Sequence, residues 1–209
     1  MCIRDSIWGV AFGNIVRGVK LDANHEYAGG FFDLLNPYAL LGGLTTLALF
    51  VLHGAVFLAV KTDGEMRERA GRLAERIAPA TIPVAGGFLA WTAFSHHDVA
   101  GWLFFAAAAL ALAGAAFATR FRREGWAFLA TGATLVLAVF GLFVTLFPDV
   151  MPSSIAAANS LTVDNASSTP YTLKVMTWVA VAFTPIVLVY QGWTYWVFRK
   201  RLTVDRIPV

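Results

Sequence analysis

The sequence predicts an all-α fold: a polytopic membrane helix bundle with five complete transmembrane helices and the end of a preceding one. Hydrophobic residues make up 58% of the 209-residue chain and charged residues 14%, whereas a typical soluble domain is about 25% charged. The mean hydropathy is +0.65. The uncharged runs also approach the roughly 20 residues that an α-helix needs to cross a 30 Å hydrocarbon core. These three observations favour a membrane protein over a soluble domain.

The expected elements follow in order along the chain. Residues 7–15 are predicted to end a helix and residues 16–35 to form a polar loop, after which Asn36 is placed to cap a helix with Pro37 in its first turn. The later apolar runs are too long and too uniform for barrel strands, so helices are expected to satisfy the backbone in lipid. The complete spans are predicted at about residues 37–60, 79–94, 99–119, 126–147 and 173–198.

Basic residues predict the orientation of these spans. Twelve of the sixteen Lys and Arg residues fall in residues 61–78, 120–124 and 199–209. The alternate loops hold only Arg17, Lys20 and Lys174. By the positive-inside rule the larger group and the C-terminus lie in the cytoplasm. The net charge of +3 is thus assigned to membrane topology, and no nucleic-acid partner is expected.

Residues 61–78 alternate acidic and basic side chains at helical spacing. We expect a solvated helix that links the first two spans, with contact to anionic lipids as the alternative. Pairs three or four residues apart stabilise such a helix. The predicted pairs are Glu65–Arg69, Glu68–Arg72 and Arg72–Glu75–Arg76.

Small residues within the spans predict close helix packing, because they let two backbones approach each other. They occur as Gly42–Gly43, as Gly86–Gly87 and as an alanine-rich run over residues 106–118.

Histidines supply the most pointed candidates for chemistry. His53 lies inside a predicted span, where an ionisable residue suggests a function such as haem ligation or proton relay. The favoured interpretation is a neutral imidazole hydrogen-bonded to a neighbouring helix. His96, His97 and Asp98 form a triplet that could bind a metal, but consecutive residues rarely converge on one ion, so solvated turn residues are favoured. His25 falls in the first long loop and indicates little.

Acidic loop residues are the remaining candidates. They could guide protons at a membrane face, but loop and cap roles are favoured for all four: Glu26, Asp33, Asp149 and Asp164. Met151 could ligate haem iron, although its Pro-Ser context favours a turn, and Ser153 or Ser154 is expected to cap a short helical turn. No catalytic, cofactor-binding or metal-binding residue is predicted in this chain.

The 25-residue stretch 148–172 is long for a loop and is expected to be ordered. We predict that it packs, together with the last span, against the fourth span. Asp164 is expected to accept hydrogen bonds from backbone N–H groups or from Ser167 and Ser168.

Several long motifs in this chain resemble one family. FPDVMPSS (147–154), NSLTVDNASST (159–169) and LKVMTWVAVAFTPIVLVYQGWTYW (173–196) are similar to the C-terminal end of subunit II of cytochrome bd-type quinol oxidase. FFDLLNPYALLGGL (31–44) and GVAFGNIVRGV (9–19) extend the resemblance upstream. The family's subunit has further helices before the GVAFGN segment. MCIRDS lies outside the resemblance, so residues 1–6 are expected to be a non-native start and residues 7–209 the membrane domain.

This resemblance implies a function that composition cannot give. The chain would be a fragment of a membrane subunit that carries no haem, in a bacterial plasma-membrane complex that oxidises quinol and reduces oxygen to water. The b and d haems and the quinol site are implied for the partner, subunit I, and the fragment alone would not be catalytic. Two alternatives stay open. A small-solute transporter predicts broken helices with polar residues near the midplane, and an assembly or scaffold protein predicts no haem-bearing partner.

Overall fold

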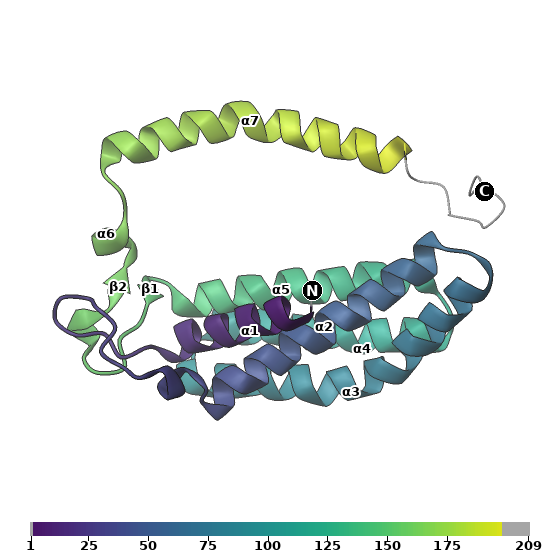
Figure 1. Ribbon diagram of the computed structural model, residues 1–209, viewed down its shortest axis with the longest axis horizontal. Coiled ribbons are helices and arrows are strands. Elements are labelled where there is room, and N and C mark those ends of the chain that lie inside the picture. The colour runs from purple at the N-terminus through teal and green to yellow at the C-terminus, as the bar shows by residue number, and fades with distance from the viewer. Residues whose placement is uncertain (1, 198–209) are drawn as a thin grey trace.

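Five helices pack side by side into a bundle, and a sixth long helix runs apart from it (Figure 1). The computed structural model describes residues 2–197. The bundle consists of α1 (Cys2–Arg17), α2 (Pro37–Lys61), α3 (Gly64–His96), α4 (Val99–Arg120) and α5 (Glu124–Leu146), and the separate helix is α7 (Pro170–Val197). Within the described residues, five helices are long and apolar enough to cross a membrane, namely α2, α3, α4, α5 and α7. The predicted all-α membrane bundle with five spans is confirmed.

The bundle has two chemically different ends. The short turns after α2 and α4 lie at one end, which we call the basic end because the Arg-rich residues 61–78 and 120–124 lie there. Residues 18–36, 97–98 and 147–169 lie at the other, which we call the loop end. The third basic group of the sequence, residues 199–209, lies outside the described residues.

Helix α3 is longer than predicted. It joins the expected linking helix and the second span into one helix of 33 residues that continues through Pro79 and Pro83. Asp63 caps its start by accepting a hydrogen bond from the Gly64 N–H at 3.1 Å. The stretch before Pro79 is rich in Ala, Arg and Glu, which favour helix and outweigh the single Gly71, so the helix continues from the charged half into the apolar half.

The charged half of α3 is tied to the rest of the bundle. Two predicted pairs are confirmed, Arg69–Glu65 at 2.5 Å and Arg72–Glu68 at 3.1 Å. The predicted Arg72–Glu75–Arg76 group is wrong, because Glu75 pairs with Arg120 of α4 at 2.5 Å. Arg67 similarly reaches Glu124 of α5 at 2.8 Å. Contacts between helices therefore compete with pairs along one helix at the basic end.

The apolar core forms two clusters along the bundle. The cluster at the basic end includes Leu52, Val56 and Leu112, and the cluster at the loop end includes Val16, Phe88 and Phe105. Helix α2 packs against α1, α3 and α5, while α4 packs against α3 and α5. The face of α4 that packs against the bundle is lined by alanines, with Ala108 and Ala115 both 0% exposed, while Ala106, Ala109 and Ala113 lie on the exposed face. This confirms the packing role predicted for the alanine run.

Helices α1 and α2 cross at the distance that only small residues allow. A Cβ atom built on Gly9 would lie 2.8 Å from the Gly42 carbonyl oxygen and 2.8 Å from the Gly43 Cα. Gly9 and Gly13 form a GxxxG pair, which brings helix backbones together in membranes. The packing role of Gly42–Gly43 is confirmed. That of Gly86–Gly87 is wrong, because a Cβ atom at either position would meet nothing within 4 Å.

The long segments at the loop end hold each other. Residues 147–166 contain β1 (Asp149–Met151), η2 (Ala157–Asn159), β2 (Leu161–Thr162) and α6 (Val163–Ala166), and β1 pairs with β2 in antiparallel register. Residues 18–36 contain η1 (Phe31–Leu34). The Val19 N–H donates to the Pro152 carbonyl at 3.0 Å, and the Ser154 N–H donates to the Val19 carbonyl at 2.8 Å. The prediction of an ordered loop is therefore confirmed.

The residues that order this loop differ from those expected. The Ser153 hydroxyl donates to the Leu21 carbonyl at 3.0 Å and caps no helix. Thr162 and Asn165 cap α6 reciprocally, at 3.3 and 2.7 Å. The bond predicted for the Asp164 side chain is wrong in its atom, because the Ser167 hydroxyl donates to the main-chain carbonyl of Asp164 at 3.4 Å. A side-chain amide or hydroxyl group can both donate and accept hydrogen bonds, whereas a carboxylate such as that of Asp164 can only accept them.

The last helix does not pack as predicted. Among its described residues α7 has none that is buried, and Figure 1 shows it running from the loop end toward the basic end, apart from α5. The prediction that α7 packs against α5 is wrong for this chain by itself. In a bilayer, lipid tails solvate an apolar helix as well as another helix does, so no hydrophobic force drives the two together.

Gly9→Ala tests the close crossing of α1 and α2. The added methyl group would lie 2.8 Å from main-chain atoms of α2, so the helices must separate. We expect a loss of about 1–3 kcal/mol in the free energy of unfolding, as for other overpacked contacts, measured by denaturant unfolding in detergent micelles. Gly86→Ala is the matched control and should be neutral or slightly stabilising, because alanine favours helix by about 1 kcal/mol over glycine. Equal effects of the two changes would contradict this account.

Candidate functional site

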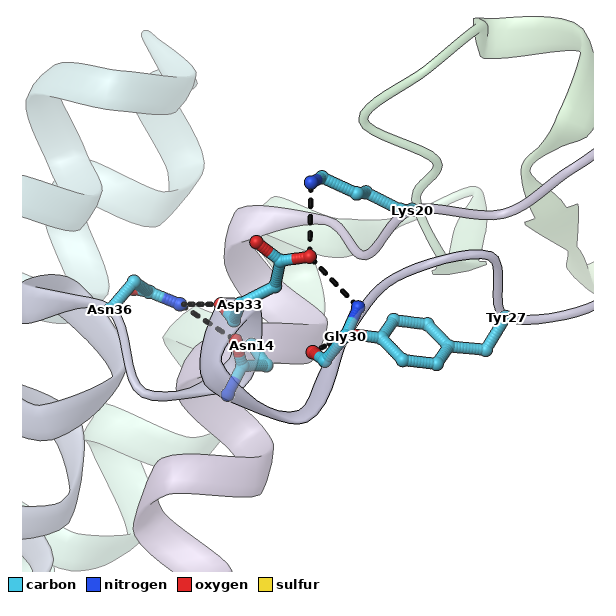
Figure 2. A network of polar contacts seen from close by, with 6 residues as sticks. All are labelled: Asn14, Lys20, Tyr27, Gly30, Asp33 and Asn36. Atoms are coloured by element: carbon cyan, nitrogen blue, oxygen red, sulfur yellow. Dashed lines mark hydrogen bonds and ion pairs between the residues drawn. The ribbon is translucent and has the colours of Figure 1, made fainter.

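A network of polar side chains joins the end of α1 to the start of α2 at the loop end (Figure 2). Asn14 is its centre and is 6% exposed. Its amide nitrogen donates to the carbonyls of Val10 at 2.9 Å and Leu34 at 2.8 Å, and its amide oxygen accepts from the Asn36 side chain at 2.8 Å. Every polar atom of this buried amide group is thus satisfied, as burial demands.

Asn36 connects this network to the helix that follows. Its side-chain oxygen accepts a hydrogen bond from the Ala39 N–H at 2.9 Å, and Pro37 occupies the first helical position. The predicted cap is confirmed. One asparagine therefore begins α2 and also holds it to α1 through Asn14.

Asp33 closes the loop above the two asparagines. Its carboxylate accepts hydrogen bonds from the Gly30 N–H at 2.9 Å and the Lys20 ammonium at 3.0 Å. These two donors, the Gly30 N–H foremost, hold the pKa of Asp33 below its ordinary value. The Tyr27 hydroxyl donates to the Gly30 carbonyl at 2.9 Å (Figure 2). The loop role predicted for Asp33 is confirmed, and both sides of the Gly30 backbone are bonded.

His53 is engaged with a neighbouring helix, as the favoured interpretation predicted. Its Nδ1 lies 2.7 Å from the Thr131 hydroxyl of α5, and its ring stacks on Phe128 with the centroids 4.8 Å apart. The Thr131 hydroxyl also lies 3.0 Å from the carbonyls of Ala127 and Phe128. Because its single proton is directed to those carbonyls, the hydroxyl is placed to accept from an Nδ1–H.

The triplet after α3 serves the turn between two helices. The two ring nitrogens of His96 face the carbonyls of Thr92 at 3.2 Å and Val16 at 3.1 Å. His97 ends α3 in the left-handed conformation with φ of 51°, and Asp98 caps α4 by accepting from the Gly101 N–H at 2.7 Å. The His96 and Asp98 side chains thus contact different partners and His97 shapes the turn through its backbone, as the turn interpretation predicted.

The candidate ligands on this chain lie apart and contact protein groups. Within the described residues no group of three or more His, Cys, Asp or Glu side chains could hold a metal ion. A haem ligand needs a free imidazole nitrogen or thioether facing a macrocycle-sized space. The Nδ1 of His53 is bonded to Thr131 and one ring face is covered by Phe128, while both nitrogens of His96 face carbonyls. Met151 lies in β1.

The other loop candidates lie around the same end. The His25 ring nitrogen Nδ1 is 3.0 Å from the Asn159 carbonyl, which links the two long loops. The Glu26 N–H donates to the Asp22 carboxylate at 2.9 Å. Asp149 pairs with Thr162 in the small sheet.

Sequence reasoning missed the central residue of the network. Asn14 lies in the apolar stretch GVAFGNIV, where an isolated polar side chain is expensive unless it is paired. The free-energy cost of an isolated polar side chain was therefore the signal that could have identified Asn14. The Glu124–Arg67 contact was missed as well, and its signal was an acidic residue directly after the basic run 120–123.

The chain is similar over nearly its whole length to known respiratory subunits. The family model described as "Cytochrome bd terminal oxidase subunit II" matches residues 3–198. Cytochrome bd ubiquinol oxidase subunit 2 of Bacillus subtilis is 37% identical over 202 residues, which cover 94% of this chain and 60% of that relative. Cytochrome bd-I ubiquinol oxidase subunit 2 of Escherichia coli K12 is 32% identical over 237 residues, covering 95% and 62%. The chain therefore spans about three fifths of the length of these curated relatives.

The Asp33 contacts predict a pH-dependent loop. Because the pKa of Asp33 is lower in the folded loop than its ordinary value of 3.8, its contribution to loop stability is present above pH 3.8 and is lost as the pH falls through the folded pKa. We expect amide hydrogen exchange in residues 18–36, corrected for intrinsic rates, to increase at that acidic step. Asp33→Asn should show the faster exchange already at pH 7, with no step.

Glu26→Gln is the control for the pH experiment, because it neutralises another carboxylate of the same loop. It should keep the wild-type profile. An unchanged acidic step in Asp33→Asn would assign the step to another group.

Proposed function

The chain belongs to the cytochrome bd terminal oxidase subunit II family, and on this basis we propose that it acts as a membrane subunit without haem in a bd-type quinol:oxygen oxidoreductase. The observation that carries this proposal is the family match over residues 3–198, which spans every long helix of the structure. The chain's relatives are named as subunits of ubiquinol oxidases. The partner that this implies is the haem-bearing subunit I of an aerobic respiratory complex.

The complex would couple two redox half-reactions. Quinol loses electrons and protons to become quinone, and oxygen takes up electrons and protons to become water. Haems of the b and d types supply the electron transfer and the oxygen chemistry when they are bound, and we assign them to subunit I. Both ring nitrogens of His96 and the Nδ1 of His53 are already directed to oxygen atoms of this chain, which supports that assignment.

The supporting role follows from what the described side chains do. They join helices to one another, cap helix ends and close the loop end, which are the tasks of a scaffold around a partner's reaction centre. Helix α7 leaves all of its apolar surface available to lipid or to protein. The transporter alternative is not supported, because α2, α4 and α5 run unbroken through the membrane-length segments.

We propose that the basic end faces the cytoplasm of a bacterial cell and that the loop end faces outward. The Arg-rich residues 61–78 and 120–124 support this orientation through the positive-inside rule. The direction of α7, from the loop end toward the basic end, supports a cytoplasmic C-terminus.

Affinity purification tests the proposed complex. A tagged copy of the chain, isolated from its own membrane in mild detergent, should carry a haem-bearing subunit with a Soret band and should oxidise quinol. The chain expressed alone should show no Soret band. The complex formed with His53→Ala should keep its ratio of haem to protein, since that imidazole is bonded to Thr131. A Soret band in the isolated chain that disappears in His53→Ala would overturn the assignment, as would a pull-down without any haem protein.

Reporter fusions test the orientation separately. A reporter fused after Val209 should be active only if its activity is cytoplasmic, and a reporter inserted in residues 18–36 only if it requires export. The opposite pattern would place the basic end outside.

A further inference from the structure

A polar cavity opens beside the network at the loop end. It has a volume of about 250 Å³ and is bounded by three stretches of chain that are distant in sequence: the end of α1, the loop 18–36 and the segment after β1. Its wall includes Asn14, Arg17, Lys20, Asp33 and Ser154. Hydrogen bonds between Val19 and residues 152–154 hold the wall together at 2.8–3.0 Å. The cavity is therefore a built feature of the loop end.

Positive charge dominates this cavity. Arg17 and Lys20 line it together with a single carboxylate, that of Asp33. Asp33 is already satisfied by the Gly30 N–H and by Lys20. The Arg17 guanidinium makes no hydrogen bond or ion pair in the part of the chain that the structure describes, yet it lies near enough to Asp33 to help lower the pKa of that carboxyl. An unpaired guanidinium beside an ammonium is a typical arrangement for binding a phosphate group.

The height of the cavity in the membrane identifies the source of such a phosphate. The cavity lies where α1 ends at Arg17 and α2 begins at Pro37, which is the boundary of the apolar spans and the depth of lipid headgroups. Phe31 and Phe32 directly precede Asp33, and they are 70% and 83% exposed. Exposed aromatic rings at this depth pack well against the interfacial part of a lipid. A cavity smaller than the pockets of about 300 Å³ and above that enclose whole ligands suits a headgroup with its chains left outside.

We propose that this cavity binds the phosphate group of an anionic phospholipid in the leaflet at the loop end, with Arg17 as its main contact. The guanidinium offers a forked pair of donors to two phosphate oxygens, and Lys20 is shared between the phosphate and Asp33. Phe31 and Phe32 lie beside the glycerol and upper chain region of the same lipid. This site is independent of haem and quinol chemistry, and it holds whichever complex the chain joins.

Native mass spectrometry of the full chain, purified from its membrane with its accompanying subunits and then delipidated, tests the proposal. Three probes separate the sources of binding energy: dioleoyl phosphatidylglycerol, dioleoylglycerol with the same chains but no phosphate, and inorganic phosphate. The wild type should retain one phosphatidylglycerol that Arg17→Gln binds about tenfold more weakly, the loss expected for one charge-assisted contact. Arg17→Lys should fall between the two, because it keeps the charge without the fork.

Lys174→Gln is the matched control, since it removes a cation at the same end of the membrane but outside the cavity. It should bind phosphatidylglycerol as the wild type does. Equal weakening by Lys174→Gln would reduce the effect to general surface charge and overturn the site. Binding of inorganic phosphate as tight as that of the lipid, or equal retention of dioleoylglycerol, would overturn the lipid assignment. An unfolding temperature of Arg17→Gln equal to that of the wild type would show that the loss of binding is local. If that temperature falls, the weaker binding of Arg17→Lys tests the proposal instead.

Discussion

The close crossing of α1 and α2 is the contact on which the loop end of the molecule depends. Gly9 and Gly13 let the two backbones meet, and this places Asn14 within reach of the Leu34 carbonyl and the Asn36 side chain. Those bonds fold the loop 18–36 back over the bundle. The main-chain groups of Val19 and Leu21 then face the segment after β1 and are paired by it. Each step satisfies a backbone group that would otherwise be unpaired beside an apolar bundle.

The helices and their caps could be predicted from the sequence because they depend on residues that are close to one another along the chain. Length and apolarity gave the five spans, and Asn36 followed by Pro37 gave the start of α2. The partner type of His53 was also predictable, since a half-buried imidazole needs a hydrogen-bonding group. The identity of that partner, Thr131, was not, because the two residues are 78 positions apart and only the bundle geometry brings them together.

The contacts between the two long loops depend on separations larger still. The Ser153 hydroxyl and the Leu21 carbonyl are 132 positions apart, and both lie in loops that carry no periodic pattern. Local reasoning assigned Ser153 to a helix cap for that reason. The prediction for the charged half of α3 was similarly wrong at Glu75. From the sequence, a basic residue on the same helix was as suitable a partner as Arg120 on α4. The sequence shows which polar groups need partners, and the tertiary structure determines which of several equally suitable residues becomes the partner.

The separate course of α7 bears on how the chain is made. Helices α1 to α5 form both apolar clusters without any described residue of α7, and the hydrogen bonds described between loop 18–36 and the segment after β1 reach no further than Asn159. Synthesis proceeds from the N-terminus, so α1 to α5 leave the ribosome before α7 does. Lateral release of α7 into the bilayer is then a separate event from folding of the bundle. The lipids or protein helices that finally surround α7 are those present in the membrane when it is released.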